Sequence, residues 1–181
     1  MFEVARLLGS TRRSIVLQTH LGNSIENEIA SAPDERNTRK YQHLLANHSN
    51  WIERRPPYGI CNCVGHVWAS RRTAVYENID SQVIRFFHDD GFSVLNWPSD
   101  HLRLGDLVTY WDSAKLHAGF VHIGLVFEFK SLGAGSQQIP WILSKWDDSS
   151  GEVLHHYKNV PFPDDIEVEF WTDRELQRTG K

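Results

Sequence analysis

The sequence predicts an α+β fold built as one domain, 1–181, and two patterns and the composition support this. Helix-type apolar spacing fills residues 31–89, and strand-type alternation follows after Gly91. Helices followed by antiparallel strands are the α+β pattern. The composition, with 40% hydrophobic residues, 7 Trp and 9 Phe, supplies the apolar bulk for a core.

Four helices are expected, each from a local signal. A residue that can cap, an early proline and an acidic first turn predict a helix that starts at Ser31. Val64, Trp68 and Arg71 share one face of another helix, because they follow the i, i+4, i+7 spacing. Gly91 ends the last helix. The expected helices cover residues 3–9, 31–47, 62–75 and 81–89, with a turn-rich connector at 54–59.

The strands are expected mainly in the second half of the chain, where apolar and polar residues alternate. A polar segment at 147–151 predicts a hairpin turn, and N-terminal helices should pack on an antiparallel sheet meander. Residues 1–57 would form a helical N-terminal extension and 58–172 the core, with a frayed helical tail after Asp173. The expected strands cover residues 14–19, 107–111, 120–129, 139–146, 153–157 and 166–171.

The charge balance and the cysteine count narrow the classes of protein. A net charge of −4 argues against general nucleic-acid binding, which needs a basic face. No apolar run is long enough to span a bilayer, and no secretory signal is seen at the N-terminus. With two cysteines, the chain has no disulfide framework, so reduced thiols and a cytoplasmic location are expected, without membrane or nucleic-acid partners.

Both cysteines lie within one short segment, Cys61-Asn62-Cys63. Asn62 can cap the following helix, which places Cys63 in the first turn and Cys61 outside it. The helix start favours a thiolate, so Cys63 is the expected nucleophile. The alternative is that both thiols are small buried apolar groups.

A catalytic thiol needs a base and an orienting group, and His122 is the candidate base because it lies in a buried strand. The alternative is a core histidine. Ser144 ranks first as its orienting group and Asp147 second, whereas Lys145, which only donates, would bind a substrate carboxylate or another anion. An oxygen within about 3.2 Å of an His122 nitrogen would identify the orienting group. Without one, a non-catalytic domain is favoured.

A metal site is the weaker interpretation of the same residues. Cys61, Cys63, His66 and His122 offer four ligands, but structural zinc sites usually have wider spacings such as C-x2-C. No metal and no cofactor are therefore expected.

The order of three segments resembles the NlpC/P60 group of papain-like cysteine hydrolases, and the similarity covers about residues 58–147. These segments are Asn62–Val67 at a helix start, Leu102–Tyr110 with its Gly-Asp-Leu-Val motif, and His122–Leu125. The chain also resembles a less characterised bacterial branch with C-x-C and W-x-x-S-K motifs, here at Cys61–Val64 and Trp141–Lys145, followed by a hairpin at 152–156.

This resemblance implies a papain-like fold and a thiol-dependent hydrolase, an amidase or peptidase that cleaves an amide bond in a peptide substrate. It implies that Cys63 attacks the carbonyl and that His122 transfers the proton. Helix-start amides beside Asn62, with the Tyr58 hydroxyl, would stabilise the oxyanion. The family usually has His, Asn or Gln as its third residue, and the corresponding strand here ends in Ser144-Lys145. The alternative is a catalytically inactive papain-like fold that serves as a protein-interaction module.

Overall fold

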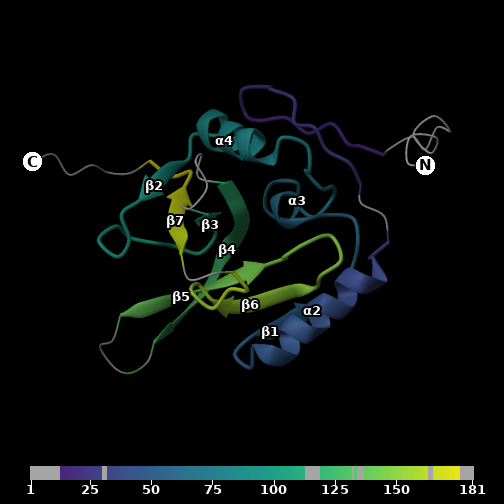
Figure 1. Ribbon diagram of the computed structural model, residues 1–181. Coiled ribbons are helices and arrows are strands. Elements are labelled where there is room, and N and C mark those ends of the chain that lie inside the picture. The colour runs from purple at the N-terminus through teal and green to yellow at the C-terminus, as the bar shows by residue number, and fades with distance from the viewer. Residues whose placement is uncertain are drawn as a thin grey trace, which may run out of the picture.

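A seven-stranded sheet lies at the centre of the molecule, with strand order β1-β6-β5-β4-β3-β7-β2 and antiparallel pairing throughout (Figure 1). The computed structural model describes residues 13–29, 32–112, 119–131, 133, 137–162 and 165–175. The α+β class is therefore confirmed. The strands are β1 (Ile52–Arg55), β2 (Ser93–Leu95), β3 (Leu107–Asp112), β4 (Gly119–Ser131), β5 (Gln138–Ser144), β6 (Glu152–His156) and β7 (Ile166–Thr172), and the described helices are α2 (Glu35–Asn47), α3 (Cys63–Trp68) and α4 (Ile79–Asp89).

Different helices cover the two faces of the sheet. Residues of α3 and α4 form one hydrophobic cluster with Ile123 of β4. Helix α2 packs through Tyr41 against Val153 of β6. Val153 pairs with Ser144, so their side chains share one face of the sheet. The Ser144 side chain lies over Gly124. Gly124 follows Ile123 in β4, so this face is the opposite one from the face that carries the Ile123 side chain. Helix α2 therefore lies on the other face from α3 and α4.

The three described helices confirm the expected helices but differ at their ends. Helix α2 begins after Asp34, whose carboxylate accepts a hydrogen bond from the backbone of Asn37 at 2.9 Å, and the expected start at Ser31 lies outside the described residues. Helix α3 is shorter than the predicted 62–75, because Ser70 and Arg71 adopt positive φ values of 48° and 66° that a right-handed helix excludes. Helix α4 begins two residues earlier than expected.

The five later strands are confirmed to within two residues at most ends, with a longer C-terminal end expected for β5. Two edge strands were not predicted, because short polar edges lack the alternation of a half-buried strand. All four residues of β1 are exposed, and β2 has three residues. Strand β1 pairs with β6, so the expected boundary at residue 57 does not separate an extension from the core.

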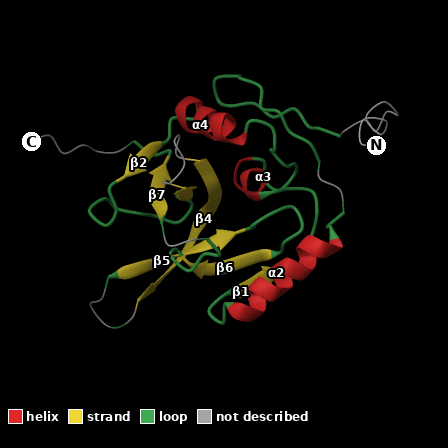
Figure 2. Ribbon diagram, in the orientation of Figure 1, coloured by secondary structure: helices red, strands yellow, loops and turns green. Residues whose placement is uncertain are grey.

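The segment 13–29 has no regular strand, and the strand expected at 14–19 is wrong. It has one bridge of its own, between Gln18 and Ser24, and appears as an irregular loop beside α4 (Figure 2). Thr19 donates to the Asp89 carboxylate at 2.7 Å, so polar contacts with α4 replace strand pairing. The helix expected at 3–9 and the tail after 175 lie outside the described residues.

We predict that Gly65→Ala strongly destabilises the fold. A Cβ at Gly65 would lie 1.6 Å from the carbonyl oxygen of Thr73. Because backbone must move to relieve this clash, the free energy of unfolding should fall by about 3 kcal/mol. At Gly133 an added Cβ meets nothing within 4 Å, so Gly133→Ala should stay within about 0.5 kcal/mol. Urea unfolding followed by Trp fluorescence measures both, and equal stabilities would contradict the close packing at Gly65.

Candidate functional site

Asn62 and Cys63 occupy the predicted positions at the start of α3. The side-chain oxygen of Asn62 accepts hydrogen bonds from the backbone N–H groups of Gly65 at 3.1 Å and Val75 at 3.2 Å. Its side-chain nitrogen donates to the Val75 carbonyl at 2.6 Å. Asn62 is thus confirmed as the helix cap. Both ends of its amide are engaged within the protein, which does not support a contact with substrate.

Cys63 is enclosed at this helix start, with 5% of its surface exposed. Burial raises the pKa of Cys63 to about 12, although the backbone N–H groups of Ile123 and Val64 lower it in part. Burial therefore opposes the thiolate expected at Cys63, because the cost of burying a charge exceeds the benefit of the helix start.

His122 faces the opposite side of the sheet from Cys63. Its ring lies 4.5 Å from that of Trp146 and 5.7 Å from that of Tyr110, whereas the adjacent Ile123 shares a hydrophobic cluster with Cys63. His122 is fully buried, and neither ring nitrogen has a hydrogen-bond partner among the described residues. Burial lowers the pKa of His122 well below its usual value. The expected Cys63–His122 hydrogen bond is not formed.

Neither candidate orients His122. The Ser144 hydroxyl is bonded to Nε2 of His155 at 2.9 Å, and the Asp147 carboxylate accepts from the backbone of Ser149 at 2.7 Å. The prediction that Ser144 or Asp147 positions the imidazole is wrong for this structure. Sequence reasoning did not identify His155 on β6, which is the partner of Ser144 in the structure.

Lys145 lies on the α3 side and is completely buried. Its ammonium donates to the carbonyl oxygens of Tyr58 at 2.9 Å and Ser150 at 2.6 Å, and lies 3.9 Å from the centre of the Tyr58 ring. Burial lowers the pKa of Lys145, and the charges of Cys61 and Asp147 raise it in part. The ammonium therefore holds two chain segments together, and no contact with an external anion is needed to explain it.

The Tyr58 hydroxyl donates to the carboxylate of Glu152 at 2.7 Å. Arg71 binds the same carboxylate through two hydrogen bonds, from Nε at 2.7 Å and from Nη2 at 3.0 Å. His66 approaches within 3.6 Å and Arg55 within 3.7 Å. Burial raises the pKa of Glu152, but these neighbours lower it by more, and the carboxylate stays charged. We call Tyr58, Cys61, His66, Arg71, Lys145 and Glu152 the Glu152 cluster.

Cys61, not Cys63, is the thiol beside charged groups. Its sulfur lies 3.6 Å from the Tyr58 hydroxyl, and none of its surface is exposed. Burial raises the pKa of Cys61, while the Tyr58 hydroxyl and the Lys145 charge lower it in part. Ile60, the residue before it, has a φ of 86°, which is strained for a β-branched side chain. Enclosure leaves this thiol without access for a substrate.

Two residues of this cluster, Arg71 and Glu152, were not expected at a site. A signal existed for both, because Arg71 falls on the apolar face of the helix expected over 62–75 and Glu152 starts an apolar strand. Both carboxylate oxygens of Glu152 accept hydrogen bonds from neighbouring side chains. The arrangement therefore stabilises the junction between α3, β5 and β6 and presents no reactive group at the surface.

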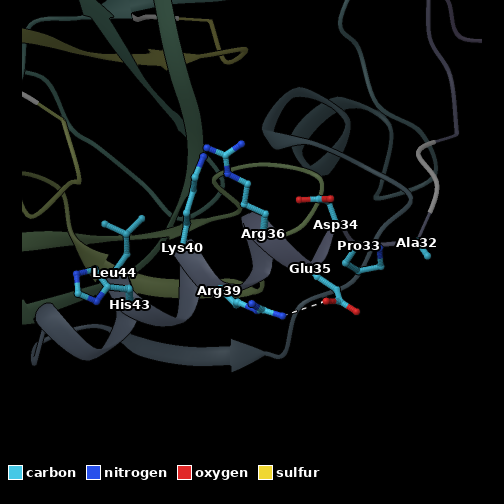
Figure 3. Close-up of a pocket in the computed structure, with 9 residues that line it drawn as sticks. All are labelled: Ala32, Pro33, Asp34, Glu35, Arg36, Arg39, Lys40, His43 and Leu44. Carbon is cyan, nitrogen blue, oxygen red and sulfur yellow. Dashed lines mark hydrogen bonds and ion pairs between the residues drawn. The ribbon is translucent and has the colours of Figure 1, made fainter.

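A large hollow lined by described residues lies elsewhere, on α2 (Figure 3). It has a volume of about 1120 Å³ and is largely open to solvent. We call it the α2 groove. Its lining residues are Ala32, Pro33, Asp34, Glu35, Arg36, Arg39, Lys40, His43 and Leu44.

Comparison with known proteins identifies no relative: no family model, no curated protein and no solved structure matches this chain. The resemblance to the NlpC/P60 group therefore stays a prediction. Within the described ranges, no three His, Cys, Asp or Glu side chains gather as metal ligands, and no helix has the length and apolarity to cross a bilayer.

Glu152→Gln should lower the free energy of unfolding by about 2–3 kcal/mol at pH 7. The substitution keeps the shape but leaves the half-buried Arg71 without a charged partner. Because the folded pKa of Glu152 is lowered, the difference should persist above its usual pKa of 4.5 and shrink as the pH falls below that value. Urea unfolding at several pH values tests this. Glu35→Gln, which removes an exposed pair, is the control and should change stability by less than about 0.5 kcal/mol.

Mild acid should destabilise the protein through its buried neutral histidines. Burial lowers the pKa of His155 from 6.5 to about 4, so the unfolded chain binds protons more readily than the folded one. The stability present above pH 6.5 should therefore be lost as the pH falls towards 4, by about 3 kcal/mol for His155 alone. Thermal unfolding between pH 7 and 4 measures this. His155→Gln should flatten the profile and the exposed His43→Gln should not; identical profiles would refute the assignment.

Proposed function

We propose that this chain is a non-catalytic protein-interaction domain that binds a partner through the α2 groove. The proposal rests on one observation: the open hollow lies on α2, whereas Cys63 and His122, the two residues predicted to be catalytic, are buried elsewhere. The groove is open to solvent, whereas Cys63 and His122 are 5% and 0% exposed. Open hollows of this size are where ligands and partner segments dock.

A papain-like architecture remains part of this proposal. A short helix that starts with Cys63 packs on β4, the strand that carries His122, within an antiparallel meander of β3 to β6. This order supports a fold of the NlpC/P60 type that has lost its catalytic contacts. Two free thiols support a reducing, cytoplasmic setting.

The thiol hydrolase stays a prediction with a specific structural requirement. Cys63 and His122 would have to meet, although Ile123 and His122 point to opposite faces of β4. His122 would also have to replace His155 as the partner of Ser144. Both changes involve fully buried side chains, so the interaction domain is the simpler proposal.

Thiol reactivity and turnover together test this proposal. We expect both thiols of the folded protein to react with iodoacetamide at least ~100-fold more slowly than in urea, because burial raises both pKa values and blocks access. Mass spectrometry on Cys61→Ser and Cys63→Ser variants assigns each rate. We also expect no cleavage of a mixed peptide library. Fast labelling of Cys63 with a midpoint near or below ~8.5, together with cleavage that Cys63→Ser abolishes, would establish the hydrolase instead.

A further inference from the structure

The α2 groove contains two exposed cations, Arg36 and Lys40. Arg36 and Lys40 are exposed, extend from the same side of α2, and make no hydrogen bond or ion pair among the described residues (Figure 3). The other charges of the groove are already engaged. Arg39 pairs with Glu35 at 3.1 Å, and the Asp34 carboxylate caps the helix. An excess of positive charge therefore lies in the groove of a chain whose net charge is −4.

The spacing of Arg36 and Lys40 along α2 indicates which kind of ligand fits the groove. Residues four apart on a helix are separated by about 6 Å along its axis, so two carboxylates at that separation can pair with Arg36 and Lys40 together. Apolar surface flanks them, with Pro33 at one end and Leu44 at the other. The helical part of the groove, from Glu35 to Leu44, is about 14 Å long, the length of a peptide segment rather than of a small metabolite.

We infer that the α2 groove binds an acidic peptide segment of a partner protein, with two carboxylates about 6 Å apart between apolar residues. This inference rests on the proposed interaction function. A nucleic acid fits less well, because its phosphates form a continuous row and the groove begins with the carboxylates of Asp34 and Glu35. A peptide can place neutral apolar residues against that end and acidic residues against the two cations.

A pair of synthetic peptides tests the inference. The probe is a fluorescein-labelled helical peptide of 12 residues with glutamates four apart and leucines near both ends, and its control carries glutamine in place of glutamate. Fluorescence anisotropy at low salt should show at least about tenfold tighter binding of the acidic peptide. Arg36→Gln/Lys40→Gln should weaken that binding about fivefold or more, and about 0.5 M salt should remove most of the preference.

A matched variant distinguishes pairing with Arg36 and Lys40 from a general effect of the protein's net charge on peptide binding. Arg85→Gln/Lys158→Gln removes two exposed cations outside the groove and should change the affinity by less than about twofold. Equal binding of both peptides, or equal loss in both double variants, would overturn the inference and leave the interaction domain standing. Tighter binding of a single-stranded RNA through Arg36 and Lys40 would overturn it in favour of nucleic acid. Cleavage of either peptide that Cys63→Ser abolishes would overturn the proposed function itself.

Discussion

The rest of the structure depends on the contacts that the buried Glu152 carboxylate makes with its neighbours. Glu152 lies 5% exposed at the start of β6, where an uncompensated charge would cost several kcal/mol. Arg71 and Tyr58 compensate it, and they come from the segments that follow and precede α3. Lys145 then joins the Tyr58 and Ser150 carbonyls. Two buried charged groups, Glu152 and Lys145, therefore fix both ends of α3 against β6 and the turn that precedes it.

The same enclosure determines the state of the thiols. A helix start stabilises an anion by about 0.3–1 kcal/mol, and α3 is only six residues long. The pKa of Cys63 rises from 9.0 to about 12, which corresponds to about 4 kcal/mol against the thiolate. Burial therefore outweighs the dipole by several-fold. A cysteine at a helix start becomes reactive only where solvent or a cation also reaches it, and here the cation, Lys145, lies beside Cys61.

Sequence patterns predicted the strands in which apolar residues recur at a regular spacing. They missed the contacts that depend on how the elements pack together. The alternation in β3 to β7 identified five strands, whereas β1 has four exposed residues and no alternation to detect. At the site, alternation showed that His122 and Ile123 point to opposite faces. It did not show which face α3 covers, and that choice decides whether Cys63 meets His122. The partner of Ser144 likewise depends on the register of β6, which places His155 beside it.

Helix α2 presents its groove on a rigid support, which matters for binding. Its N-terminal end is held by Ser149, whose hydroxyl accepts from the backbone of Asp34 at 3.0 Å and whose carbonyl accepts from Thr38 at 3.3 Å. Its middle is held by Tyr41, buried against Trp51. A helix fixed at these points loses little conformational freedom when a partner docks, so a larger share of each new contact appears as affinity. Ser149 belongs to the turn that Lys145 ties to Tyr58, and the Glu152 cluster therefore also positions the surface proposed to bind.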